Sequence, residues 1–266
     1  MYKQQRKSRK GSFDLATLET KYQFAQDLVK EAGAFLRQHL HDDLKVEIKS
    51  HFTDLVTHLD KDVQDNMSQA IVKAFPNDHI YGEENENRHP IDQGNVWVID
   101  PIDGTSNFIV QRSDFAVLLA YFEDGQGKFG LIYDVMSDTL YHGGGAFPVY
   151  EDDQLLSKFT DKPFSEGMIG LNAGLYAQNF ADFADQFVGI RSLGSAGLSF
   201  SRVLNQRLMA HVSYVYPWDY AAASILGEAL GYILVNEKGE KPSFNGREHV
   251  ILIAKEKLEE LKGFLK

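Results

Sequence analysis

Apolar residues near the start of the chain recur at spacings of three and four, the period of an amphipathic α-helix. This stripe predicts a helix over residues 17–41 and consists of Leu18, Tyr22, Ala25, Val29, Ala32, Leu36 and Leu40. A second stripe predicts a helix over residues 61–75, which Pro76-Asn77 ends. The first part of the domain is therefore expected to be a pair of helices.

Short apolar runs rich in β-branched and aromatic residues follow these helices, and such runs are typical of strands. They cover residues 79–81, 96–99, 115–122, 129–133 and 139–141. Asp124-Gly125 and Met136-Ser137-Asp138 separate the last three runs and have the residues of hairpin turns. Since hairpins join antiparallel strands, this part predicts a largely antiparallel sheet.

After Pro163 the predicted strands alternate with predicted helices. The strands cover residues 168–171, 208–212, 233–235 and 250–254. The helices cover residues 177–187, 195–205, 219–230 and 256–264. Such alternation predicts an α/β half packed against the antiparallel half. The sequence has no internal repeat or long linker, so residues 16–266 are expected to form one domain.

The composition is that of an ordinary globular protein. Of the 266 residues, 43% are hydrophobic and 24% are charged, which suffices for a sizeable core. Cysteine is absent, which excludes disulfides, thiolate metal sites and a cysteine nucleophile. There is neither an apolar run long enough for a membrane span nor a signal-type segment. We therefore expect a soluble, cytoplasmic protein without membrane contact.

The charge is unevenly distributed along the chain. The formal net charge is −11, yet the first ten residues contain five lysines and arginines and no acid. The rest of the chain is strongly acidic and is therefore expected to repel nucleic acid. We interpret residues 1–15 as a flexible basic arm; an electrostatic tether to RNA, a membrane or an acidic partner is the alternative reading.

The most informative segment is Asp100-Pro101-Ile102-Asp103-Gly104-Thr105, which follows an apolar strand. We expect the strand to end at Asp100, because proline stops further pairing. Gly104 permits an unusual backbone dihedral, and Thr105 is expected to cap a short helix. Two carboxylates beside a helix N-terminus suit a divalent cation and a phosphate.

Three other segments complete a pattern, although each is weak alone. They are Gly82-Glu83-Glu84 after a strand, Trp218-Asp219 at a helix start, and Asp54-Leu55-Val56-Thr57 leading into Asp60, with Lys49 upstream. In this order and spacing, and together with the segment from Asp100 to Thr105, they resemble the inositol monophosphatase family of metal-dependent phosphatases. The resemblance extends from about residue 16 to the C-terminus. It implies the sugar phosphatase fold, a layered α/β structure in which helix and sheet layers alternate as an αβαβα sandwich.

The resemblance also implies the metal ligands. Glu83, Asp100 and the main-chain carbonyl of Ile102 would hold one Mg²⁺, and Asp100, Asp103 and Asp219 a second. A third, weaker ion would lie near Glu83. Such ions polarise a phosphate and activate water. Sensitivity to Li⁺ and a homodimer are further implications.

The family's catalytic and substrate-binding residues map onto this sequence as well. Thr105 and Asp60 would orient and help deprotonate the attacking water, with Glu83 counted among the catalytic residues. Attack would be direct, without a covalent intermediate. The substrate-binding set would be Asp103, Gly104, Thr105, Gly194, Ser195 and Ala196.

One position departs from the family pattern. Members that act on inositol phosphates often have an acid seven residues before the aspartate of Trp-Asp, and Val212 holds that place here. The metal chemistry should survive this change, but recognition of an inositol ring is in doubt. The tyrosine-rich residues 214–216 could instead stack on a larger leaving group such as a nucleotide. The Ser106-Asn107-Phe108 continuation, by contrast, resembles the inositol branch more than the branch acting on 3′-phosphoadenosine nucleotides.

The expected function is Mg²⁺-dependent hydrolysis of a small phosphate ester. Inositol monophosphate is the leading substrate, followed by NADP and fructose 1,6-bisphosphate. A haloacid-dehalogenase-type phosphatase is a weaker alternative, because its two acids lie two residues apart whereas Asp100 and Asp103 lie three apart. The alternative of another class is a non-catalytic regulator that binds RNA or the transcription machinery. The complete set of acids argues against it, because a binding module need not keep so many like charges together.

Overall fold

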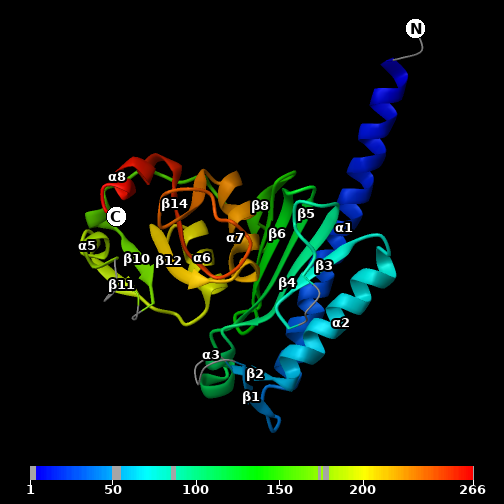
Figure 1. The fold of residues 1–266 in the computed structure, drawn as a ribbon, viewed down its shortest axis with the longest axis horizontal. Coiled ribbons are helices and arrows are strands. Elements are labelled where there is room, and N and C mark those ends of the chain that lie inside the picture. Colours follow the sequence, from blue (N-terminus) through cyan, green and yellow to red (C-terminus); the bar gives the residue numbers. More distant parts are fainter. Residues whose placement is uncertain (1–3, 50–54, 85–87, 173–174, 176–179, 266) are drawn as a thin grey trace.

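Helices and sheets alternate in five layers (Figure 1). The structure is a computed structural model that describes residues 4–49, 55–84, 88–172, 175 and 180–265. The first layer contains α1 (Gln4–Gln38) and α2 (His58–Ala74). The N-terminal part of α1 extends beyond the sheets (Figure 1). The helix thus begins well before residue 17, where the apolar stripe predicted its start.

A seven-stranded sheet forms the second layer, with its strands in sequence order. The strands are β3 (His79–Gly82), β4 (Asn95–Asp103), β5 (Ala116–Glu123), β6 (Gln126–Asp134), β7 (Thr139–Gly144), β8 (Phe147–Glu151) and β9 (Gln154–Leu155). All neighbours are antiparallel except β3 and β4, and both predicted hairpins are present. The predicted antiparallel sheet is therefore confirmed, and β8 and β9 extend it.

The helices α6 (Ala196–Leu204) and α7 (Pro217–Ala229) form the middle layer. Behind them lies a five-stranded sheet in the order β11-β10-β12-β14-β13. Its strands are β10 (Met168–Leu171), β11 (Gly189–Arg191), β12 (Ala210–Val215), β13 (Tyr232–Asn236) and β14 (Glu248–Ala254). The short helices α5 (Ala181–Ala184) and α8 (Leu258–Lys262) cover its outer face. This order of layers confirms the predicted αβαβα sandwich.

Three apolar cores hold these layers together. One packs α1 and α2 against the seven-stranded sheet around Trp97. The second lies between the two sheets, around α6 and α7, and includes Leu118 and Tyr220. The third packs α5 and α8 on the five-stranded sheet. Burying both faces of each sheet explains why the strand runs are almost continuously apolar.

The remaining elements are short. β1 (Val46–Ile48) and β2 (Leu55–Thr57) form a two-stranded ribbon, α3 (Thr105–Gln111) follows β4, and η1 (Phe164–Glu166) and η3 (Lys255–Lys257) are 3₁₀ turns. The helices predicted over residues 177–187 and 256–264 are shorter than expected, and residues 177–179 lie outside the described part. Asp54 of the sequence pattern also lies outside it. Among the described residues, no helix is long and apolar enough to cross a membrane.

Candidate functional site

Three carboxylates from two distant parts of the chain meet where β4 and α7 come together. Asp100 and Asp103 lie on β4, and Asp219 lies in the first turn of α7. One carboxylate oxygen of each lies within 4.8 Å of the others. Asp100 is 1% exposed and Asp103 is 5% exposed. The site therefore concentrates negative charge where little water can screen it.

Burial is the largest cause of the raised pKa values in this cluster. It raises the pKa values of Asp100 and Asp219 well above their ordinary range, and the charges of neighbouring carboxylates raise them further. Burial also raises the pKa of Asp103, although hydrogen bonds from Ser195, Gly197 and Ala196 act in the opposite direction. Ionised carboxylates held this closely are stable together only with a compensating cation.

The strand β4 does not end at Asp100, so this prediction was wrong. It continues through Pro101 to Asp103. Asp100 pairs with Leu118 of β5 and Asp103 pairs with Ala116, with an irregularity between the two pairs. The two pairs are three residues apart on β4 but only two residues apart on β5. This one extra residue on β4 is what defines a β-bulge. Pro101 is accommodated within this irregular stretch, where a lost ladder hydrogen bond costs little.

The N-terminus of α6 holds Asp103. The Ser195 hydroxyl donates to Asp103 Oδ2, and the N–H groups of Ala196 and Gly197 donate to its two oxygens at 3.0 and 2.7 Å. Ser195 also caps the helix by accepting from the Leu198 N–H at 3.1 Å. The predicted substrate segment therefore positions a carboxylate of the cluster.

Gly104 is the N-cap of α3 and has a φ of +93°, which confirms the expected unusual dihedral. A Cβ at this position would lie only 3.1 Å from that of Ser195. The prediction that Thr105 caps the helix was wrong, because Thr105 is the first helical residue. Its hydroxyl instead lies 3.2 Å from Asp60 Oδ1 and 3.0 Å from the Ile102 carbonyl oxygen.

Asp60 is fixed at the start of α2. Its Oδ2 accepts from the N–H and hydroxyl groups of Thr57 at 2.8 and 2.6 Å, forming a capping box. Burial raises the pKa of Asp60 to about 6, against the opposing effect of the Thr57 hydrogen bonds. The structure thus brings Thr105 and Asp60 together as the sequence predicted.

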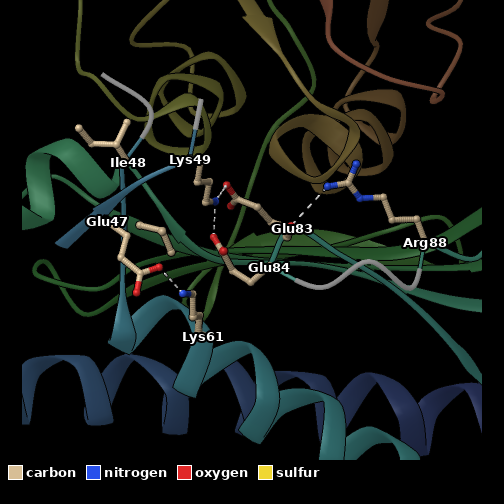
Figure 2. A pocket seen from close by; sticks show the side chains of 8 residues that line it. Glu47, Ile48, Lys49, Lys61, Glu83, Glu84 and Arg88 are labelled. Carbon is tan, nitrogen blue, oxygen red and sulfur yellow. Dashed lines mark hydrogen bonds and ion pairs between the residues drawn. The ribbon is translucent and has the colours of Figure 1, made fainter. Parts of the chain in front are cut away.

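Glu83 approaches the cluster from the end of β3. Burial raises the pKa of Glu83, and the charge of Glu83 helps to raise the pKa of Asp100, so the two carboxylates act on each other. Lys49 lies between two glutamates, 2.8 Å from Glu83 Oε1 and 2.5 Å from Glu84 Oε1 (Figure 2). These residues, together with Arg88, line a cavity of about 590 Å³. The cavity therefore reaches Glu83, one of the metal ligands that the resemblance implies.

Val212 does not face the site. It is fully buried in β12, within the apolar core between the five-stranded sheet and its outer helices. An acid at this position would lie in that core. Tyr214 and Tyr216, farther along this segment, are 40% and 37% exposed.

Two contributions to the site were not predicted from the sequence. Asn107 donates at 2.8 Å to the carbonyl oxygens of Asp114 and Leu193, which ties α3 to the segment before α6. Arg247, beside β14, lies close enough to Asp219 for its charge to lower the pKa of that residue. Asn107 lies inside the recognised motif, whereas nothing near Arg247 in the sequence marks it.

Comparison with known proteins identifies the family to which this chain belongs. The model of the inositol monophosphatase family matches residues 17–263. The chain belongs to this family. It is 36% identical to inositol-1-monophosphatase of Bacillus subtilis (strain 168) over 232 residues, or 84% of this chain and 87% of that one. The chain is accordingly a phosphatase that hydrolyses phosphomonoesters.

Other relatives are named for different activities. The chain is 30% identical to a fructose-1,6-bisphosphatase/inositol-1-monophosphatase of Thermotoga maritima, which covers 90% of this chain and 98% of that one. A crystal structure of an IMPase/NADP phosphatase complexed with Mg²⁺ and phosphate superposes with a TM-score of 0.86 at 26% identity, covering 94% and 96% of the two chains. The family membership thus fixes the reaction class and leaves the substrate open.

Proposed function

We propose that this protein uses Mg²⁺ to hydrolyse a small phosphate ester, with inositol monophosphate as the leading substrate. The main support for this proposal is the carboxylate cluster of Asp100, Asp103 and Asp219. One carboxylate oxygen of each lies within 4.8 Å of the others. The Thr105–Asp60 pair lies beside these carboxylates. A buried acidic cluster next to an oriented hydroxyl provides a cation site and a place for a water nucleophile.

The donor set fits Mg²⁺. All side-chain donors are carboxylate oxygens, which this hard cation prefers, and their buried like charges need a cation. Asp100, Asp103 and Asp219, with Glu83 and the Ile102 carbonyl, would hold two or three ions. When bound, Mg²⁺ would polarise the phosphate and lower the pKa of water.

Thr105 and Asp60 would orient the attacking water. The Thr105 hydroxyl donates to Asp60 and can accept from water, so a proton can pass from water through Thr105 to Asp60. The raised pKa of Asp60, about 6, makes it a better proton acceptor than an ordinary aspartate. The N–H groups of Gly104 and Thr105 would bind the phosphate oxygens. Water would attack phosphorus directly and release the alcohol.

The choice of substrate rests on the relatives. The Bacillus subtilis protein is an inositol-1-monophosphatase, which favours inositol 1-phosphate. Fructose 1,6-bisphosphate and NADP are the alternatives, given the names of the other relatives. A single domain with a flexible basic arm, a homodimer, a cytoplasmic location and sensitivity to Li⁺ stay predictions from the sequence and the family.

Phosphate release from inositol 1-phosphate, fructose 1,6-bisphosphate and NADP, each with Mg²⁺ and with EDTA, tests the proposal. We expect turnover that requires Mg²⁺ and favours inositol 1-phosphate. Turnover that survives EDTA would contradict the metal mechanism. A phosphorylated Asp100 trapped during turnover would favour the haloacid-dehalogenase-type reaction instead.

A further inference from the structure

Two arginines flank a pair of stacked aromatic rings at the start of α7, and the proposed hydrolysis does not use them. The Arg88 guanidinium lies 4.6 Å from the ring centre of Trp218. Tyr216 stacks on Trp218, with ring centres 4.6 Å apart and an interplanar angle of 15°. The Arg247 guanidinium lies 5.6 Å from the ring centre of Tyr216. We refer to these four side chains as the stacked row.

The stacked row joins three distant parts of the chain. Tyr216 is the N-cap of α7, and Trp218 lies in its first turn. Arg88 follows β3 and forms a bridge with Tyr81 of that strand. Arg247 directly precedes β14, and its Nε donates to a main-chain carbonyl oxygen of β12 at 3.1 Å. The row therefore connects the start of α7 to an edge strand of one sheet and to the other sheet.

This row also reaches the main chain of two proposed metal ligands. Asp219 follows Trp218, and the Tyr216 N–H donates to Asp219 Oδ2 at 2.8 Å. The guanidinium of Arg88 lies 3.5 Å from the main-chain carbonyl oxygen of Glu83 (Figure 2). Arg88 thus lies between the segments that carry Glu83 and Asp219. A shift of Trp218 would move Asp219 relative to the rest of the carboxylate cluster.

The contacts of Arg88 distinguish it from the other cations of its cavity. Lys49 and Lys61 line the same cavity, and both are paired with glutamates. Arg88 has no ion pair among the residues that the structure describes, and its guanidinium lies over Trp218 instead. Trp218 is only 4% exposed, so this contact is partly shielded from water. A cation over a tryptophan ring is the strongest pairing of this kind.

We propose that Arg88 is a positioning residue that acts through Trp218 to hold Asp219 in place as a cation ligand. Arg247 supports the other end of the row through Tyr216. Arg88 itself would touch neither the cation nor the substrate. The inference rests on the proposed function, because it concerns the cation site on which that hydrolysis depends.

The sign of one measurement separates positioning from simple electrostatics. A positive charge near a cation site repels the cation, so removal of that charge alone would tighten Mg²⁺ binding. If Arg88 positions Asp219, its removal weakens Mg²⁺ binding instead, because a displaced ligand binds less well. Isothermal titration calorimetry with Mg²⁺ alone, in the absence of substrate, measures the dissociation constant.

Arg88→Gln should raise the Mg²⁺ dissociation constant roughly fivefold. Arg88→Lys keeps a cation that can lie over the ring and should recover most of the affinity. Arg191→Gln changes an exposed arginine of β11 and is the matched control, which should bind Mg²⁺ as the wild-type protein does. Unchanged or tighter binding by Arg88→Gln would overturn the inference.

A double-mutant cycle tests whether Arg88 acts through Trp218. Trp218→Leu removes the ring, so adding Arg88→Gln to this variant should weaken Mg²⁺ binding no further. The same fivefold loss in both backgrounds would show that Arg88 acts without the ring. Thermal melts in EDTA establish that each variant folds. If Trp218→Leu does not fold, the comparison of Arg88→Gln with Arg88→Lys still decides the outcome.

Amide hydrogen exchange in EDTA gives a readout without metal. The Tyr216 N–H, which donates to Asp219, should exchange about fivefold faster in Arg88→Gln, because its hydrogen bond opens more often. The Gly197 N–H, which donates to Asp103, should exchange at its wild-type rate. Equal exchange of Tyr216 in both proteins would contradict the positioning role. Absence of Mg²⁺ binding by the wild-type protein would instead overturn the proposed function itself.

Discussion

Asp100 and Asp103 are three residues apart in the sequence, yet their side chains lie on the same face of the seven-stranded sheet. In a regular strand such residues point to opposite faces. Here their partners on β5, Leu118 and Ala116, are only two residues apart, so the bulge restores a common face. That face packs against α6 and α7, where Asp219 and the Ser195 hydroxyl complete the site.

Asp100 is central to the cluster, so we expect Asp100→Asn to lower kcat at least about hundredfold with any substrate. The amide removes one negative charge and one ligand oxygen from the proposed cation site. Phosphate release at saturating Mg²⁺ measures the effect. Asp62→Asn, an exposed carboxylate on α2, is the control and should be as active as the wild-type protein. Wild-type turnover by Asp100→Asn would show that the site is misassigned.

The Thr105 hydroxyl is expected to act in catalysis rather than in folding. Thr105→Val keeps the shape but removes the contact with Asp60, and kcat should fall roughly hundredfold. Thr105→Ser restores the hydroxyl and should recover most of the rate. Single-turnover kinetics and a thermal melt of each variant give the comparison. If serine and valine were equally inactive, the hydroxyl would not be the active group.

Ser195 should tune cation binding through Asp103. Ser195→Ala removes the hydroxyl that donates to Asp103, and we expect the Mg²⁺ concentration for half-maximal activity to rise about tenfold. A Mg²⁺ titration of activity measures it. Ser201→Ala is the matched control, because this buried serine of α6 donates only within its own helix. A similar shift in both variants would point to a general effect on α6.

Val212→Glu should destabilise the protein rather than confer recognition of inositol. It places a carboxylate in an apolar core, at an expected cost of about 3 kcal/mol or more. Val188→Glu makes the same substitution at a residue that is 66% exposed and should leave stability unchanged. Urea unfolding of the two variants gives the free energies. A stable Val212→Glu with better turnover of inositol 1-phosphate would contradict the packing argument.

The buried carboxylates should make the metal-free protein less stable as pH rises. Asp60 has a pKa of about 6, and the pKa values of Asp100, Asp219 and Glu83 are also raised, so the folded state binds protons more tightly than the unfolded state. The stability from these protons is present at low pH and is lost as pH rises through the folded pKa values.

Thermal melts in EDTA should therefore show a Tm that falls between about pH 5 and about pH 8. Added Mg²⁺ should raise the Tm more at the higher pH, where the carboxylates are ionised. Asp100→Asn should weaken both effects. A Tm in EDTA that is flat or rises over this range would show that the cluster does not control stability.

The sequence by itself determined the parts that depend on local pattern and on a recognisable motif. The stripe from Leu18 to Leu40 predicted a helix because its period matches that of an amphipathic helix. The turn residues at Asp124-Gly125 predicted a hairpin because few residues adopt its positive φ angles. The family motif placed Asp60 near Thr105, and the structure joins them at 3.2 Å.

Only the tertiary structure decided the features that depend on distant partners. The bulge after Asp100 needs the register of β5, and the ligands of Asp103 come from the start of α6. Val212 faces the core because strand residues alternate between faces and the outer helices cover that face. Arg247 meets Tyr214 because β12 and β14 pair, a contact that no local pattern encodes.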